Sequence, residues 1–375
     1  MKIGILTHPL DYNYGCLLQA FALQKTLAGL GHDVITINRY TDPHKPFLYL
    51  LRSWCLRFVK KVIKKADVSL AWNPTETMAI KNKLSSNTNI FVDRNIVNTG
   101  IVLPKDLSRI DDEYRFDAYV VGSDQVWLPH FCPNSFLDFV KRDNVVRLFY
   151  AASSGKKSFA DNQVLAEKCK ELCAKFAGVS VREQSLIQLV KEALGRDAVQ
   201  VLDPTLLLNK EDYLRACIDT GESSPVIFTY ILDKNNEKRK LVDKVKSVLQ
   251  LPVESGTVEN DYVRGKHMNI NDCLYPSVDH WINSLNRAKF VVTDSFHGTC
   301  MSIIFGKPFV VVGNAARGIE RFNSVLSLFD LKNRLIETVD GFNDSMLGDL
   351  PLDIINKILS QKRKESIGFL KQYLS

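Results

Sequence analysis

No stretch of this 375-residue sequence approaches the ~18 consecutive apolar residues that a membrane-spanning helix needs, which argues against an integral membrane protein. The sequence also lacks repeats of fixed period and low-complexity tracts, which excludes solenoid and fibrous folds. Its eight cysteines form no CxxC pair and no cluster with histidine at metal-site spacing, so we expect reduced thiols and no bound metal. With 45% hydrophobic and 24% charged residues, the composition is that of a globular protein, and the length suggests two domains.

Positive charge is in small excess, with 49 Lys and Arg against 42 Asp and Glu. Residues 52–65 hold six basic residues and no acidic one, and three more basic residues stand together at 362–364. The rest of the chain is close to balanced, so we do not expect a nucleic-acid partner. Apolar residues at helical spacing within 51–65 predict an amphipathic basic helix. It could lie on an anionic membrane face, or it could be a solvated helix packed on the first domain.

Short β-branched runs alternate with helical patterns, which is typical of parallel sheets covered by helices. Strands are predicted at residues 2–6, 33–37, 118–121, 147–152, 178–181, 200–202, 226–231, 290–293 and 308–312. A strand that ends at Pro204, followed by the Gly/Ser/Pro-rich stretch 221–225, indicates a domain boundary near residue 215. We predict an α/β fold with two Rossmann-like domains, 1–215 and 216–375. Residues of about 41–115 would form an irregular helical insertion, and the terminal helices could pack back on the first domain.

Ligands of open α/β sheets bind at the carboxyl ends of the strands, near helix amino termini that attract anions. Loops of small and polar residues stand at such positions at 7–16, 121–127 and 151–155. Each of them could equally be a tight turn that caps a helix. The first is not GxGxxG and offers no obvious acidic residue for a ribose, so a dinucleotide site is not expected there.

Two further loops carry residues with more specific chemistry. Arg182 follows a predicted strand, where a guanidinium can hold a carboxylate or phosphate, although an exposed pair with Glu183 is the alternative. His297 lies between a strand end and a helix start, where an imidazole can donate to an anion or exchange a proton near neutral pH. Arg317 and Arg321 are candidates for a second anion clamp.

Six groups of short motifs follow one another along the chain. They are KIGI at 2–5 with NYG at 13–15 and LQA at 18–20, VGSDQVW at 121–127, AAS at 151–153, VSVRE at 179–183, VLDPTLL at 201–207, and TDSFHG at 293–298. Together they resemble the polysaccharide pyruvyl transferase family. The resemblance implies a GT-B-like fold, with two Rossmann-like halves that face a cleft. It also implies transfer of a pyruvyl group from phosphoenolpyruvate to a sugar of a cell-surface polysaccharide or its lipid-linked precursor, which forms a ketal and releases phosphate without a cofactor.

The resemblance also assigns residues to the donor. It places Arg182 and His297 in contact with phosphoenolpyruvate. Several relatives have an arginine at the position of Ser295, so a clamp must come from elsewhere in this sequence, for which Arg317 and Arg321 are candidates. The full set expected at the donor is Ser153, Arg182, Ser295, His297, Gly298, Arg317 and Arg321.

Proton transfer and acceptor binding need other groups. His297 is the candidate acid or phosphate contact, and Asp124 or Asp11 could take a proton from the acceptor hydroxyl. The acceptor-binding candidates are Asn13, Tyr14, Gly15, Ser123, Gln125 and Trp127. Tyr14 and Trp127 offer flat apolar faces on which sugars stack, whereas burial of Trp127 behind its loop is the alternative.

Other functions fit the same cleft. A GT-B glycosyltransferase would bind a nucleotide sugar near His297, and a scaffold protein of polysaccharide assembly would not need that residue. Residues 2–6 are predicted to form a buried strand rather than a secretory leader, so we expect a cytoplasmic protein. Peripheral contact with the inner face of the cell membrane through 51–65 would follow if the acceptor is carried on a lipid. The sequence indicates no oligomeric state.

Overall fold

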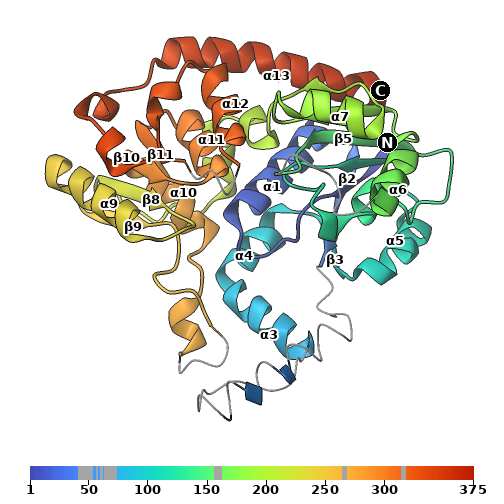
Figure 1. Ribbon diagram of the computed structural model, residues 1–375, viewed down its shortest axis with the longest axis horizontal. Helices are drawn as coiled ribbons and strands as arrows, with labels where there is room; N and C mark the ends of the chain where they lie inside the picture. The colour runs from blue at the N-terminus through green and yellow to red at the C-terminus, as the bar shows by residue number, and fades with distance from the viewer. Residues whose placement is uncertain are drawn as a thin grey trace.

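Two parallel β-sheets form the framework of the protein (Figure 1). The computed structural model describes residues 1–40, 54–55, 58–59, 62, 74–155, 163–263, 268–313 and 318–375. The strand order is β3-β2-β1-β4-β5-β6-β7 in the first sheet and β12-β11-β10-β8-β9 in the second. Helices lie against both sheets, which confirms the predicted α/β fold.

The first sheet takes its strands from the N-terminal half. Its strands are β1 (Lys2–Leu6), β2 (Asp33–Arg39), β3 (Asn98–Val102), β4 (Ala118–Val121), β5 (Val146–Ala152), β6 (Gly178–Val181) and β7 (Val199–Gln200). The helices of this half are α1 (Tyr14–Gly29), α3 (Pro74–Leu84), α4 (Ser86–Asn95), α5 (Leu107–Tyr114), α6 (Gln163–Cys173) and α7 (Leu186–Leu194). Central strands such as β4 are buried along their whole length, because helices cover both faces of a parallel sheet.

The second sheet takes its strands from the C-terminal half. Its strands are β8 (Val226–Tyr230), β9 (Val253–Ser255), β10 (Ala288–Thr293), β11 (Phe309–Val312) and β12 (Leu335–Ile336). The helices after β7 are α8 (Lys210–Ala216), α9 (Asn236–Leu249), α10 (Val278–Arg287), α11 (Phe296–Ile304), α12 (Glu320–Leu328) and α13 (Leu352–Leu374). In the part of the chain that the structure describes, no helix has the length and apolar character needed to cross a membrane.

All nine predicted strands occur, with their ends within two residues of the expected positions. The three strands that the sequence did not predict, β3, β9 and β12, all lie at sheet edges. Edge strands are short and partly exposed, so their apolar pattern is weak. β3, which begins with Asn98, Thr99 and Gly100, falls inside the segment expected to be an irregular helical insertion, and here that expectation does not hold.

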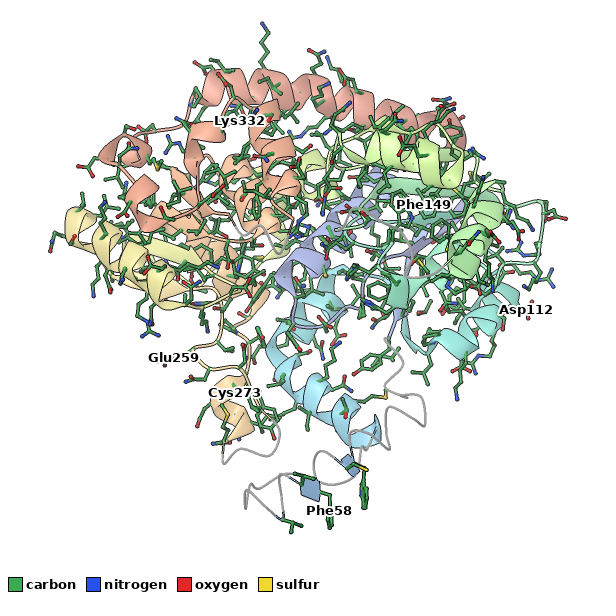
Figure 2. The ribbon with its side chains drawn as sticks, viewed as in Figure 1. Phe58, Asp112, Phe149, Glu259, Cys273 and Lys332 are labelled. Atoms are coloured by element: carbon green, nitrogen blue, oxygen red, sulfur yellow. The ribbon has the colours of Figure 1, made fainter. Side chains whose placement is uncertain are left out.

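Aromatic packing fills the interior of the first half. Phe149 of β5 stacks on Phe176 with ring centroids 4.0 Å apart, and its place among the surrounding side chains is visible in Figure 2. On the other face of the sheet, one continuous buried cluster includes residues of β1, α1, β8, α11 and α13. The two halves therefore share a core instead of meeting only through exposed loops.

The C-terminal helix α13 joins the two halves. It begins beside the second sheet and runs across the top of the molecule to the first (Figure 1). Ser366 on this helix accepts a hydrogen bond from the backbone N–H of Leu202 at 2.9 Å, and Arg363 Nε donates to the carbonyl of Leu206 at 2.6 Å. The chain leaves the first sheet at Gln200 and enters the second at Val226, while the boundary near residue 215 stays a prediction.

Candidate active site

Loops at the carboxyl ends of several strands bring charged side chains together between the two sheets. Asp124 follows β4, Arg182 follows β6, and Asp203 follows β7, all in the first half. His297 comes from the second half, in the first turn of α11 directly after β10. Since the carboxyl ends of parallel strands meet at one edge of a sheet, residues far apart in the sequence become neighbours there.

Arg182 is the centre of a buried ion network. Its Nη1 donates to Asp203 Oδ2 at 3.0 Å, its Nη2 to Asp124 Oδ1 at 3.3 Å, and its Nε to Glu183 Oε1 at 3.1 Å. The ring of Phe296 covers the guanidinium at 4.0 Å, and only 2% of the Arg182 side chain is exposed. The pairing with Glu183 that the sequence left open therefore occurs, but inside the protein. All three guanidinium nitrogens donate to carboxylates, which favours a positioning role for Arg182 over a direct contact with the donor.

Two carboxylates of this network, Asp124 and Asp203, stay ionised although they are buried. Burial raises the pKa of Asp124, but the positive charges of His8, Arg182 and other nearby groups outweigh it and hold this pKa well below the usual range. Burial likewise raises the pKa of Asp203, and His297 and Arg182 lower it well below the usual range. Because burial also lowers the pKa of His8, we regard Arg182 as the main fixed charge beside Asp124.

Asp203 connects the network to His297. Its Oδ2 accepts a hydrogen bond from Ser123 Oγ at 3.0 Å and lies 3.6 Å from His297 Nε2. Its Oδ1 accepts from the hydroxyl of Thr205 at 2.7 Å. The distance to Nε2 is too long for a hydrogen bond, so Asp203 can orient the imidazole electrostatically. Among the described residues, Nε2 of His297 has no hydrogen-bond partner, although the atom is buried.

Gly15 provides the space that His297 occupies. A Cβ atom added at Gly15 would lie 2.2 Å from Nδ1 of His297, which is far inside van der Waals contact. The first turns of α1 and α11 therefore meet at this ring. Gly15 is one of the predicted acceptor-binding residues, and its close neighbour in the structure is the His297 side chain.

We expect Gly15→Ala to lower the catalytic rate by about 10²-fold, the scale of loss from a 1 Å misplacement of a reacting group. The added methyl group must push the His297 ring away from its position. The matched control is Gly29→Ala on the same helix, where an added Cβ meets no atom within 4 Å. Steady-state rates of both variants with the same substrates provide the comparison. Equal rates for wild type and Gly15→Ala would contradict this role of Gly15.

The aromatic residues expected to stack on a sugar are buried. Trp127 is 0% exposed, and its ring packs edge-on against Phe149 with centroids 5.1 Å apart. Tyr14 is 1% exposed, its ring stacks on Trp281 at 5.8 Å, and its hydroxyl donates to the carbonyl of Pro276. Neither ring presents a face to a ligand, so the expectation of sugar stacking does not hold for them. Both rings contribute to the core instead.

Most of the other candidate residues support the loops of the site. Ser153 is fully buried and donates to Glu183 Oε1 at 3.0 Å. Ser295 accepts a hydrogen bond from the backbone N–H of Gly298 at 3.3 Å and so caps α11. Asn13 caps α1 in the same way. Gln125 is half-buried beside Gly155. Arg321 lies close enough to Asp124 to lower the pKa of that carboxyl group. Arg317 lies outside the described residues.

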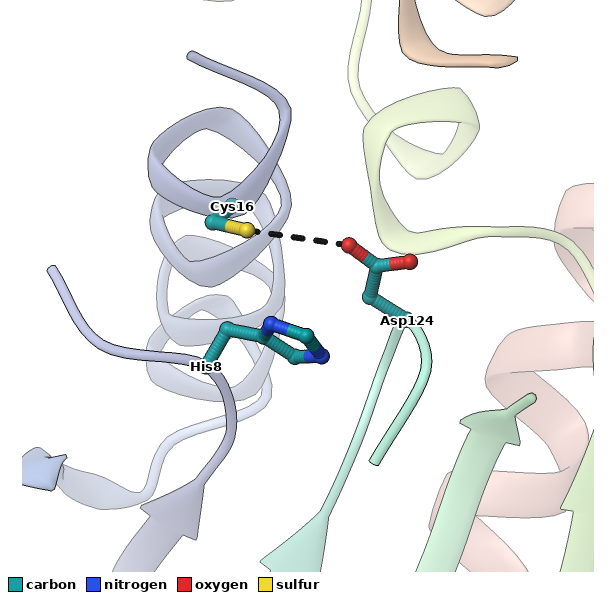
Figure 3. A group of neighbouring side chains, drawn as sticks. All are labelled: His8, Cys16 and Asp124. Atoms are coloured by element: carbon teal, nitrogen blue, oxygen red, sulfur yellow. Dashed lines mark hydrogen bonds between the residues drawn. The ribbon is translucent and has the colours of Figure 1, made fainter. Parts of the chain in front are cut away.

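His8, Cys16 and Asp124 form a compact group beside the network, as Figure 3 shows. One ligand-type atom of each lies within 4.8 Å of the others, and Cys16 Sγ donates to Asp124 Oδ2 at 3.7 Å. Burial and the Asp124 carboxylate raise the pKa of the Cys16 thiol well above its usual range, so the thiol is protonated near neutral pH. Arg182 already binds the same carboxylate. A protonated thiol and a carboxylate that already pairs with Arg182 are poor ligands, so these residues do not fit a cation site.

Comparison with known proteins agrees with this fold. A structure described as a UDP-N-acetylglucosamine 2-epimerase from Listeria monocytogenes has a TM-score of 0.50 at 11% identity, and the match covers 98% of this chain and 91% of that one. MnaA of S. aureus bound to UDP has a TM-score of 0.49 at 13% identity, with 98% and 90% covered. The spinosyn forosaminyltransferase SpnP has a TM-score of 0.44 at 13% identity, with 99% and 95% covered. At such identities the likeness concerns the fold alone, and the TM-score of 0.50 for the epimerase from Listeria monocytogenes supports the GT-B-like fold.

Sequence comparison identifies the family. No curated protein matches the sequence significantly. The sequence model of the polysaccharide pyruvyl transferase family, in contrast, matches residues 13–315. This span includes Gly15, Asp124, Arg182, Asp203 and His297. The match includes strands of both sheets and the loops that carry Asp124, Arg182, Asp203 and His297, whereas His8 and Arg321 lie outside it. The chain therefore belongs to the polysaccharide pyruvyl transferase family, whose members are transferases of polysaccharide biosynthesis.

Proposed function

We propose that the protein transfers a pyruvyl group from phosphoenolpyruvate to two hydroxyls of a sugar in a cell-surface polysaccharide or its lipid-linked precursor. The observation that carries the proposal is the position of His297. It lies within the part of the chain that matches the family, and its Nε2 faces the carboxylate of Asp203 where the two halves meet. Phosphoenolpyruvate is a small anion, and the amino terminus of α11 at this point attracts anions.

The proposed reaction needs a proton donor but no oxidant. The methylene carbon of the enol takes up a proton and becomes a methyl group, while the oxygen of one acceptor hydroxyl bonds to the neighbouring carbon. The bond from that carbon to the phosphate oxygen breaks, and phosphate leaves with the electron pair. The second hydroxyl then bonds to the same carbon and closes the ketal. The acceptor hydroxyls release two protons. One of them restores the proton donor that protonated the methylene carbon, and the other leaves with phosphate.

His297 is the group we assign to proton transfer. Histidine is the side chain that most often serves as a general acid or base, and the carboxylate of Asp203 lies 3.6 Å from Nε2 of this one. Asp124 remains the candidate for accepting a proton from the acceptor, but its lowered pKa makes it a weak base. Its contacts with Arg182 favour an electrostatic and positioning role. Arg321 is the described arginine we assign to the donor, on the strength of its electrostatic effect at Asp124.

The first experiment tests the donor and the product together. Purified protein is incubated with phosphoenolpyruvate and galactose-, mannose- or N-acetylmannosamine-type acceptors, and phosphate and acceptor mass are measured. We expect phosphate release together with a mass gain of one pyruvate less one water. Thermal stabilisation by UDP or CMP nucleotides and not by phosphoenolpyruvate would instead indicate a glycosyltransferase that uses a nucleotide sugar. No product and no donor binding across the panel would contradict pyruvyl transfer.

We also propose a peripheral contact with the inner face of the cell membrane through residues 51–65, which would bring a cytoplasmic enzyme to a lipid-linked acceptor. Most of this segment lies outside the described residues. Of those described, Trp54, Phe58 and Val62 have 46%, 44% and 58% of their surface exposed. The rings of Trp54 and Phe58 stack at 5.4 Å, and Phe58 lies away from both sheets (Figure 2). Exposed apolar residues among basic ones suit an anionic lipid surface.

We expect liposomes that contain anionic lipid to retain the protein in sedimentation, and neutral liposomes to retain much less of it. Replacing Trp54 and Phe58 by serine should reduce this retention, because the exposed apolar area is removed. The melting temperature should stay unchanged, since neither ring is part of the core clusters. Equal retention by neutral and anionic liposomes would argue against the membrane contact.

A further inference from the structure

A polar cavity of about 210 Å³ lies beside the loop that leads from β1 to α1. The same loop carries His8 to the candidate active site and then contributes Asp11 to the wall of the cavity. The hydroxyl of Thr88 on α4 donates to the carbonyl of Asp11 at 3.2 Å, so the loop is fixed against that helix. Other polar residues of the wall are Asn38 on β2, Tyr40 directly after β2, Asn82 on α3, and Asn89 and Asp93 on α4.

Several amide groups on the wall are open to a ligand. The side chains of Asn82 and Asn89 make no hydrogen bond to any other residue that the structure describes. Asn38 accepts a hydrogen bond from the backbone N–H of Leu10 at 3.1 Å, which engages its oxygen and leaves its NH₂ group as a donor. Each amide offers donors and an acceptor, which is the pairing that sugar hydroxyl and acetamido groups require.

The charges on the wall argue against an anionic ligand. Lys81 Nζ lies 2.6 Å from Asp11 Oδ2, and its ammonium group also lies 5.0 Å from the centre of the Tyr40 ring. The positive charge of Lys81 is therefore balanced by Asp11, and Asp93 adds a further negative charge. Phosphoenolpyruvate, with its carboxylate and phosphate, does not suit this cavity. An uncharged ligand rich in hydroxyls does.

We propose that this cavity binds a neutral sugar residue of the acceptor, adjacent in the saccharide chain to the residue that receives the pyruvyl group. The inference rests on the proposed function and adds an acceptor subsite to it. The volume lies below the ~300 Å³ at which pockets for drug-sized ligands begin, which suits a single sugar residue. The shared loop from His8 to Asp11 places the subsite next to the candidate active site. Of the wall residues, only Asp11 was predicted from the sequence to meet the acceptor, as a candidate proton acceptor.

The test compares a longer acceptor with a shorter one. In the Asn82→Ala/Asn89→Ala double variant, we expect the KM for a neutral oligosaccharide acceptor to rise by about 10- to 100-fold, because each lost hydrogen bond is worth about 0.5–1.5 kcal/mol. The KM for the corresponding monosaccharide, the KM for phosphoenolpyruvate and kcat should not change. Asn333→Ala is the control, since Asn333 is an exposed asparagine of the other half. An unchanged KM for the oligosaccharide would overturn the subsite.

A binding measurement separates this inference from the proposed function. Saturation-transfer NMR records the contact of neutral di- and trisaccharides of galactose, mannose and N-acetylmannosamine with the wild type and the double variant, in the absence of donor. Binding by the wild type that the double variant loses would support the subsite, even if phosphoenolpyruvate proved not to be the donor. Equal binding by both proteins, no binding by the wild type, or tighter binding of a uronic-acid saccharide than of the neutral ones would overturn it.

Discussion

Replacement of Arg182 by methionine is expected to lower the free energy of unfolding by about 3–5 kcal/mol. This is the usual loss in proteins when one partner of a buried ion pair is removed (about 3–5 kcal/mol). Methionine fills much of the same volume but leaves the carboxylates of Asp124, Glu183 and Asp203 without their shared partner. These groups lie where water cannot replace the guanidinium, since 2% of the Arg182 side chain is exposed. Urea unfolding of the variant and the wild type measures the difference.

The matched control for this prediction is Arg215→Met. Arg215 pairs with Asp212 at 2.7 Å, but 67% of its side chain is exposed, so we expect a loss of at most about 1 kcal/mol. Arg182→Lys keeps the positive charge. It helps to separate an effect of Arg182 on the free energy of unfolding from an effect on donor binding. If Arg182 positions the loops, the lysine variant should be less stable than the wild type and retain affinity for the donor. Wild-type stability of Arg182→Met would contradict the buried network.

Replacement of His297 by glutamine is expected to reduce phosphate release from phosphoenolpyruvate by about 10²- to 10⁴-fold, the usual contribution of a general acid or base. Glutamine can fill the space beside Gly15 and form hydrogen bonds, but it cannot exchange a proton near neutral pH. We expect little change in the melting temperature, because the imidazole Nε2 makes no hydrogen bond to a described residue. Initial rates at saturating donor and acceptor measure the effect.

A second histidine variant provides the control. His280 lies on α10, where its Nε2 is 3.0 Å from Glu254 Oε1 and a third of its side chain is exposed. His280→Gln should keep the wild-type rate, because no residue of the candidate site touches this pair. If His297→Gln retained activity within a few-fold of the wild type, His297 would have no part in proton transfer.

The sequence predicted the interior of the fold better than its borders. Central strands such as β1 and β10 are mostly apolar, because helices cover both faces of each sheet, and the apolar runs 3–6 and 290–292 are visible in the sequence. The edge strands β3 and β9 carry mixed residues, since one side of each has no neighbouring strand, and the edge strand β12 is only two residues long. Their assignment depends on pairing with distant strands, which a local pattern does not record.

Prediction of the site was limited in the same way. Arg182, His297 and Asp124 could be selected because each directly follows a strand. Asp203 stands in an equivalent position before Pro204, a signal that could have identified it, but its role depends on contacts with residues far away in the chain. The burial of Trp127 depends on Phe149, which belongs to the next strand of the sheet. Position along a strand is thus readable from sequence, whereas partners across the sheet require the structure.

The most direct test of pyruvyl transfer is the reaction in heavy water. Phosphoenolpyruvate and the acceptor that gives product are incubated with the protein in D₂O, and the ketal is examined by NMR and mass spectrometry. We predict one phosphate released per ketal, a methyl group that carries one deuterium from the solvent, and almost no product with His297→Gln. A product without the pyruvyl group, a product that requires a nucleotide sugar, or a ketal formed equally well by His297→Gln would contradict the proposal.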